Sequence, residues 1–223
     1  MKLFWWILTT LFLASCGRTD FATLQGATVT TTATNTSTNT STATSTGSQP
    51  TTIQGWVQQF DAYLASIGQP NLQPGLSCNL YTVPTSTTFI AGANLTYAAT
   101  FTYDQAFDQP DAPVTNGFNV LPVALQQIYQ TWFIMKCYGN IVVPQDGYHQ
   151  FSLTSDDGSN LYIDGLLTVN NDGLHSAQTI ASSVSITAGV HYFELDFFQA
   201  TGNQALILNE DGQLMDPGQF YFY

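Results

Sequence analysis

The strongest constraint on the fold is a strict alternation of apolar and polar residues near the end of the chain. Phe193, Leu195 and Phe197 would share one face of a strand, whereas Glu194 and Asp196 would share the other. Because the side chains of a strand point alternately to its two faces, this period of two indicates a half-buried β-strand. The same alternation recurs in three further stretches: residues 151–154, 161–164 and 206–208.

Turn-forming residues separate these stretches at the short intervals that are typical of β-sandwiches. No long helical pattern interrupts residues 76–223, so we predict an all-β domain, an antiparallel β-sandwich or squashed barrel. The turn signals are Gly139, Pro144 to Gly147, Asp157-Gly158, Asp164-Gly165, Asp172-Gly173 and Gly189.

The N-terminus carries an apolar run from Leu3 to Ala14. A membrane-spanning helix needs about 20 residues, so this run fits the core of a signal peptide better. It ends in Leu13-Ala14-Ser15-Cys16, which resembles the bacterial lipobox. The resemblance implies a signal peptide over residues 1–15 and a lipid-anchored Cys16, with the outer membrane or cell surface as the destination. An ordinary secretory leader is the alternative.

Residues 16–54 are expected to form a stalk. From Ala27 to Thr52 the chain contains almost only Thr, Ser, Asn and Ala, without charge. Such a segment has no apolar face to bury, so we predict that it is disordered or extended.

A short helical lead-in is predicted for residues 55–75. Trp56, Phe60, Tyr63 and Leu64 follow the spacing of one helical face. We expect this face to pack on the domain, since core packing is a commoner role for such aromatics than ligand binding.

The charge balance excludes some partners. The chain has 15 acidic residues and a formal net charge of −12. Cleavage before Cys16 would leave Arg18 and Lys136 as the basic side chains. A surface of this kind repels phosphate backbones, so nucleic acid is not expected as a partner.

Cys78 and Cys137 are the cysteines that remain in the predicted β-domain. In an exported protein an isolated pair of this kind favours a disulfide over two free thiols. The bridge would tie the N-terminal edge of the domain to a strand at residues 132–137.

Asp156 and Asp157 are adjacent carboxylates at the predicted end of a strand. They repel each other unless a cation or hydrogen-bond donors neutralise them, and hard oxygen ligands suit Ca²⁺. The alternative is a tight hairpin in which Asp and Gly only shape the turn. The residues themselves leave both interpretations open.

The stretch from Gly139 to Gly165 resembles the signature of a domain family named for the N-terminal fragment of anthrax protective antigen. Yeast flocculins, epithelial adhesins and large bacterial adhesins share this domain. The resemblance covers residues 76–223 and is strongest from Gly139 to Leu208. Further matches follow in order: Asp172 to His175, Ala188 to Phe193, Phe197 to Gln199 and Ala205 to Leu208.

The family resemblance implies a β-sandwich whose adhesin members bind sugars through Ca²⁺. Two consecutive Asp residues, joined by a cis peptide bond in those members, ligate the ion and match Asp156 and Asp157. A second loop supplies one side chain, matched by Gln199, and main-chain carbonyls, matched by Thr201 and Asn203. Asn203 and Gln204 could also hydrogen-bond the sugar.

Three functions follow from these observations. The first is a surface-displayed, calcium-dependent carbohydrate-binding domain that recognises a glycan. The second is a structural or protein-interaction domain of the envelope in which the Asp pair shapes a turn. The third, a hydrolase, is disfavoured because the carboxylates of a glycosidase stand about 5–9.5 Å apart across a cleft.

Overall fold

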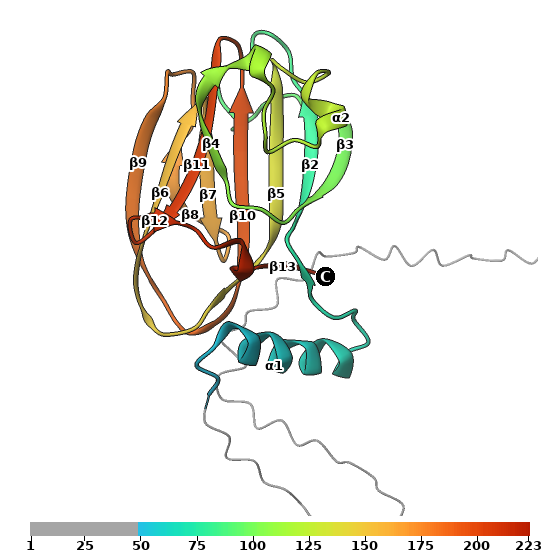
Figure 1. Cartoon of the computed structure of the whole chain (residues 1–223), viewed down its shortest axis with the longest axis vertical. Helices are drawn as coiled ribbons and strands as arrows, with labels where there is room; N and C mark the ends of the chain where they lie inside the picture. Colours follow the sequence, from blue (N-terminus) through green and yellow to red (C-terminus); the bar gives the residue numbers. More distant parts are fainter. Residues whose placement is uncertain (1–48) are drawn as a thin grey trace, which may run out of the picture. The chain divides into compact units, whose positions relative to one another are not determined.

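The computed structural model describes residues 49–223, and it confirms the predicted all-β fold with a short N-terminal helix. Two antiparallel sheets face each other (Figure 1). The predicted signal peptide at residues 1–15, the predicted lipidation site Cys16 and most of the predicted stalk lie outside the described residues. None of the helices between residues 49 and 223 has the length and hydropathy to cross a membrane.

Within the described residues, the larger sheet has eight strands. Its main order is β1-β13-β5-β10-β7-β8, and β3 pairs with β2, which pairs with β5. The strands are β1 (Gln73–Pro74), β2 (Leu76–Thr82), β3 (Thr96–Tyr103), β5 (Phe133–Val143), β7 (Ser159–Ile163), β8 (Leu166–Asn171), β10 (Gly189–Gln199) and β13 (Phe220–Phe222).

The smaller sheet has five strands in the same part of the chain, in the order β12-β11-β6-β9, with β4 paired to β11. These strands are β4 (Asp108–Pro113), β6 (Gly147–Asp156), β9 (Gln178–Ile186), β11 (Asn203–Glu210) and β12 (Gln213–Leu214). The helical segments are α1 (Ile53–Ser66), α2 (Val123–Gln126) and the 3₁₀ turns η2 (Val114–Asn116) and η3 (Pro217–Gln219).

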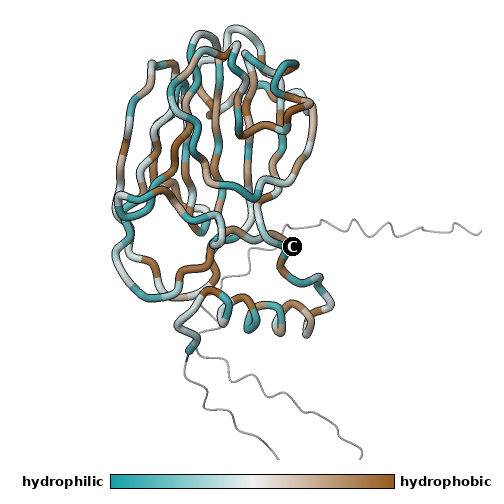
Figure 2. Tube along the Cα trace, viewed as in Figure 1, coloured by the Kyte–Doolittle hydropathy of each residue, from teal (hydrophilic) through white to brown (hydrophobic). Residues whose placement is uncertain are grey.

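The core lies between the two sheets and uses the alternating residues. Phe193, Leu195 and Phe197 of β10 are fully buried, as are Phe151 and Leu153 of β6. Figure 2 shows the corresponding alternation of hydrophobic and hydrophilic residues along the strands. Burying one such side chain contributes about 1.5–3 kcal/mol, so the period of two determines which face of each strand points inward.

Gly139 does not form the predicted turn, because it lies in the middle of β5. A Cβ atom at this position would stand 2.5 Å from the carbonyl oxygen of Tyr221 and 2.9 Å from Cδ2 of Leu76. A glycine inside a strand often marks such a close approach of another backbone. A glycine is therefore required at this position, but it is required for the packing of β13 on β5 and not for a turn.

The predicted lead-in helix is α1, which begins after Thr52. The Thr52 hydroxyl accepts a hydrogen bond of 3.1 Å from the Gly55 N–H, the usual role of an N-cap threonine. The helix packs on β5 and β10. Its buried residues are Trp56, Val57, Phe60 and Leu64.

The predicted disulfide between Cys78 and Cys137 is confirmed. The two cysteines are directly opposite each other on β2 and β5 and are fully buried. The bridge therefore ties the β2–β3 edge to the central strand of the larger sheet.

Candidate functional site

Several strands end together at one end of the sandwich. In the larger sheet Gln199 of β10 pairs with Phe133 of β5, which pairs with Thr82 of β2. Asp156 is the last residue of β6 and pairs with Ala205 of β11. The loops that follow β2, β6, β8 and β10 therefore gather at this end, the upper end in Figure 1.

Asp156 and Asp157 are both buried, each with an exposed fraction of 6%. The peptide bond between them is cis, as the family resemblance implies. Oδ2 of Asp157 accepts a hydrogen bond of 2.7 Å from the Ala200 N–H. This bond joins the aspartate pair to the loop that follows β10.

Burial changes the electrostatics of both carboxyl groups. Burial, with the neighbouring charges of Asp157 and Asp111, raises the pKa of Asp156 to about 6, against an N–H donor from Ala177. Burial also raises the pKa of Asp157, against N–H donors from Ala200 and His175. Both sites would hold their negative charge more easily with a cation beside them.

Gln199 is fully buried at the end of β10. Its amide nitrogen donates a hydrogen bond of 2.8 Å to the Asn203 carbonyl, which fixes the orientation of the amide group. The amide oxygen is then left without a hydrogen-bond partner among residues 49–223. A buried acceptor without a donor costs about 1–3 kcal/mol, and this oxygen is available to a ligand such as a cation.

The other predicted ligands lie nearby in the chain but differ in exposure. Thr201 and Asn203 are exposed, on the loop after β10 and at the start of β11. This loop is held in place because the Gly202 carbonyl accepts a hydrogen bond of 3.1 Å from the Val114 N–H. Gln204 is fully buried, and a sugar-binding role for it stays a prediction.

The donor set fits a hard cation such as Ca²⁺. Two carboxylates can neutralise the charge, and the unpartnered amide oxygen of Gln199 is a ligand of the type that Ca²⁺ prefers. Two further groups act on the aspartate pair: the charge of Asp111 raises the pKa of Asp156, and the N–H groups of His175 and Ala177 oppose the rise of the two pKa values. The sequence pattern did not assign them this role.

A second group of possible ligands lies towards the other end of β6. Ligand atoms of His149, Glu210 and Asp211 lie within 4.8 Å of one another. Nδ1 of His149 is 2.8 Å from Oε1 of Glu210, so these side chains already bond each other.

The fold is that of a β-sandwich domain. Two adjacent aspartates lie at the end of the sandwich where the loops gather. The family model described as "PA14 domain" matches residues 122–214. This is the family that the stretch from Gly139 to Leu208 resembles. The match and the fold together support the PA14 domain family for this part of the chain.

Solved structures share the fold at low sequence identity. The PA14 domain of the MpAFP antifreeze protein has a TM-score of 0.54 and 17% identity, over 68% of this chain and 92% of that one. A PA14 sugar-binding domain from an RTX adhesin has a TM-score of 0.52 and 22% identity, over 67% of this chain and 99% of that one. No curated protein sequence matches the chain.

The raised pKa of Asp156 predicts how stability depends on pH. An acid whose pKa is higher in the folded state favours folding when it is protonated. Without metal, the free energy of unfolding should therefore fall as pH rises from about 4 to about 6, by at most about 3 kcal/mol for Asp156. Saturating Ca²⁺ should remove this fall, because the ion binds the ionised carboxylates. Urea unfolding at pH 4.5 and 7.5, with Ca²⁺ or with chelator, measures the effect.

Asp196 provides the control for this experiment. Burial raises its pKa to about 6 as well, but its carboxylate is paired with Lys136 and not with a proposed metal ligand. Its contribution should be the same with and without Ca²⁺. Asp156→Asn should abolish the calcium-dependent part, and equal urea midpoints at pH 7.5 with and without Ca²⁺ would contradict the interpretation.

Proposed function

We propose that this domain binds carbohydrate through a calcium ion held by Asp156, Asp157 and Gln199. One observation carries the proposal: two buried, adjacent carboxylates lie beside the end of β10, where the buried Gln199 oxygen has no partner among the described residues. A domain with the same fold, from an RTX adhesin, is described as sugar-binding, which supports a glycan as the partner.

Each residue of the proposed site would have a distinct role in binding the ion or the sugar. Asp156 and Asp157 supply the negative charge, and the Gln199 amide oxygen with the carbonyls of Thr201 and Asn203 completes the ligand set. Bound Ca²⁺ would offer a positive centre to the hydroxyl oxygens of a sugar. The Asn203 side chain, which is exposed, would hydrogen-bond a further hydroxyl. Recognition of this kind involves no bond cleavage, and we propose that the protein is not an enzyme.

The proposed setting is the outside of a bacterial cell. Cys16 would carry the lipid anchor after removal of residues 1–15, and residues 16–54 would hold the domain away from the outer membrane. A lipid-anchored glycan-binding domain would act in adhesion or surface recognition. This setting rests on the lipobox-like sequence and on the composition of the stalk.

A glycan array tests the binding function. In the presence of Ca²⁺ the full chain should bind a restricted set of glycans, and chelator should reduce that binding at least 100-fold. Asp157→Asn should have the same effect, because one of the two charges that hold the ion is lost. Asp104→Asn is the matched control, since this exposed acid lies after β3 at the opposite end of the sandwich. Binding that survives chelator would refute the calcium mechanism.

One observation favours the alternative, a structural or protein-interaction domain. The Asp157 carboxylate accepts N–H donors from Ala200 and His175, so the main chain alone partly compensates its charge. In that case the array should be negative, and Ca²⁺ should leave the melting temperature unchanged.

A further inference from the structure

The loop between β2 and β3, residues 83–95, crosses the end of the larger sheet next to the candidate site. Its buried residues Val83 and Ile90 pack with Ile134, Phe198 and Ala200 in a small apolar cluster. This cluster joins the loop to the strand that ends in Gln199. The loop is therefore anchored to the same structural unit as the proposed metal ligands.

Asp172 fixes the middle of this loop from a distant part of the chain. Its two carboxylate oxygens accept hydrogen bonds from the main-chain N–H groups of Ile90, at 2.8 Å, and Ala91, at 3.3 Å. Asp172 begins the 172–177 loop, which donates N–H groups to the aspartate pair through His175 and Ala177. One short loop thus holds both the 83–95 loop and the candidate site.

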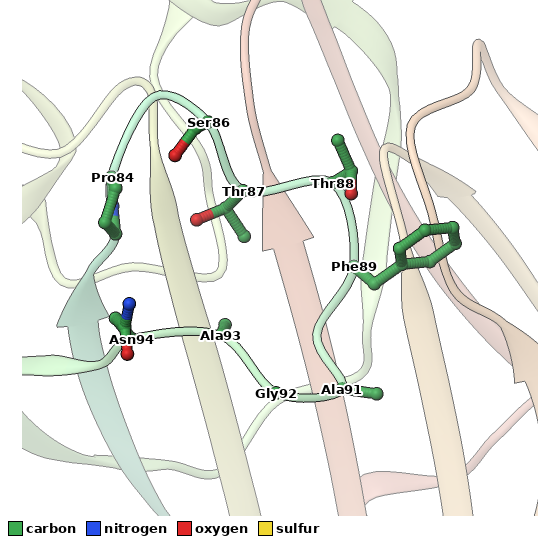
Figure 3. A pocket seen from close by; sticks show the side chains of 9 residues that line it. All are labelled: Pro84, Ser86, Thr87, Thr88, Phe89, Ala91, Gly92, Ala93 and Asn94. Atoms are coloured by element: carbon green, nitrogen blue, oxygen red, sulfur yellow. The ribbon is translucent and has the colours of Figure 1, made fainter.

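Phe89 projects from the outer bend of the 83–95 loop, away from Pro84 and Asn94 (Figure 3). The loop encloses a shallow hollow of about 210 Å³, and Phe89 is on its rim. The exposed fraction of Phe89 is 55%. A single exposed aromatic is ordinary on a protein surface. This one differs because Ile90, the next residue, is buried and donates its N–H to Asp172, and Thr87, two residues before Phe89, is buried as well.

Two glycines bring the Phe89 ring close to the aspartate pair. A Cβ atom on Gly173 would stand 3.4 Å from Cε1 of Phe89, and Gly173 has a φ of +127°. A Cβ atom on Gly158 would stand 2.7 Å from the Gly173 nitrogen. Gly158 directly follows Asp157, so only the thin backbone of Gly173 separates the ring from the residue next to the carboxylates. Leu174, which follows Gly173 in the chain, is also apolar and exposed, with an exposed fraction of 49%.

We propose that Phe89 is the aromatic wall of the carbohydrate site, on which the C–H face of a pyranose ring stacks while its hydroxyls face the Asp156–Asp157 end. This inference rests on the proposed function and adds a specificity-determining residue to it. A pyranose has one face rich in C–H groups, and sites for such ligands combine an apolar wall with a few convergent polar groups. The wall would favour sugars that present this face when their hydroxyls point to the aspartates.

The test uses the full chain and two separate titrations, with Ca²⁺ alone and with methyl glycosides of glucose, galactose, mannose and fucose in saturating Ca²⁺. Phe89→Ala should weaken binding of the preferred glycoside about tenfold and leave the affinity for Ca²⁺ unchanged. Phe89→Trp should keep binding within threefold of the wild type. Tyr148→Ala is the matched control, because Tyr148 is 83% exposed at the opposite end of β6.

The outcomes separate the two proposals. If the wild type binds a glycoside and Phe89→Ala binds it within twofold, the wall is overturned while the proposed function stands. If the wild type binds none of the glycosides and no glycan on the array, the proposed function fails and the wall fails with it. An equal loss in Tyr148→Ala would also overturn the wall, because the effect would then not depend on the site.

Discussion

Replacing Lys136 by methionine is expected to destabilise the protein by about 3–5 kcal/mol at pH 8 and by much less at pH 5. Lys136 is the only lysine or arginine within residues 49–223. Its ammonium group contacts Oδ2 of Asp196 and lies 3.5 Å from Oε1 of Glu194. The Asp196 side chain is only 2% exposed, so the substitution would leave a buried charge without its partner.

The pH dependence follows from the titration of this pair. Burial lowers the pKa of Lys136, but the carboxylates of Asp196 and Glu194 raise it by more. Burial outweighs the opposing charge of Lys136, so the pKa of Asp196 is raised to about 6. Without Lys136 the pKa of Asp196 should rise further, so the aspartate is neutral at pH 5 and the loss grows as pH increases.

Urea unfolding of wild type and Lys136→Met at the two pH values measures this prediction. The double variant Lys136→Met/Asp196→Asn is the control, because a neutral amide needs no counter-ion. It should recover most of the stability at pH 8. A loss of equal size at pH 5 and pH 8 would contradict the electrostatic explanation and indicate lost packing of the lysine stem instead.

Removing the disulfide is expected to cost about 4 kcal/mol. Cys78 and Cys137 are separated by 59 positions, so the bridge restricts a long loop in the unfolded chain. In the folded protein the bridge fastens β2 to β5, and β2 leads directly into the 83–95 loop. The double variant Cys78→Ala/Cys137→Ala should therefore lower the melting temperature by about 10 °C.

Thermal unfolding with and without reductant checks the result. The wild type in reductant should approach the melting temperature of the double variant, which reductant should leave unchanged. Cys16→Ser is the matched control, since Cys16 is not part of the bridge. A double variant within 1 °C of the wild type would show that the bridge adds little to stability.

Local patterns were sufficient to predict the fold class and the bridge. The alternation around Phe193 and Leu195 reports directly on which face is buried, and this signal is contained within one strand. The pairing of Cys78 with Cys137 followed because these were the cysteines left in the domain. The helix around Phe60 was predicted from spacing in the same way.

Contacts between distant segments could not be predicted from such patterns. Gly139 has the residue type of a turn, but its real constraint is the approach of Tyr221, which comes from the far end of the chain. The bond between Asp172 and Ile90 joins residues 82 positions apart, and no local period encodes it. The adjacent aspartates were identified from the sequence, whereas the unpartnered oxygen of Gln199 became evident only from its packing.

A calcium titration of the full chain by calorimetry tests the central claim most directly. We predict one ion for each chain, no binding in Asp157→Asn, and weaker binding in Gln199→Met, which keeps the volume of the side chain but lacks the amide oxygen. Glu210→Gln, in the group at the other end of β6, should bind like the wild type. The absence of binding to the wild type, or an undiminished stoichiometry in Asp157→Asn, would contradict the account.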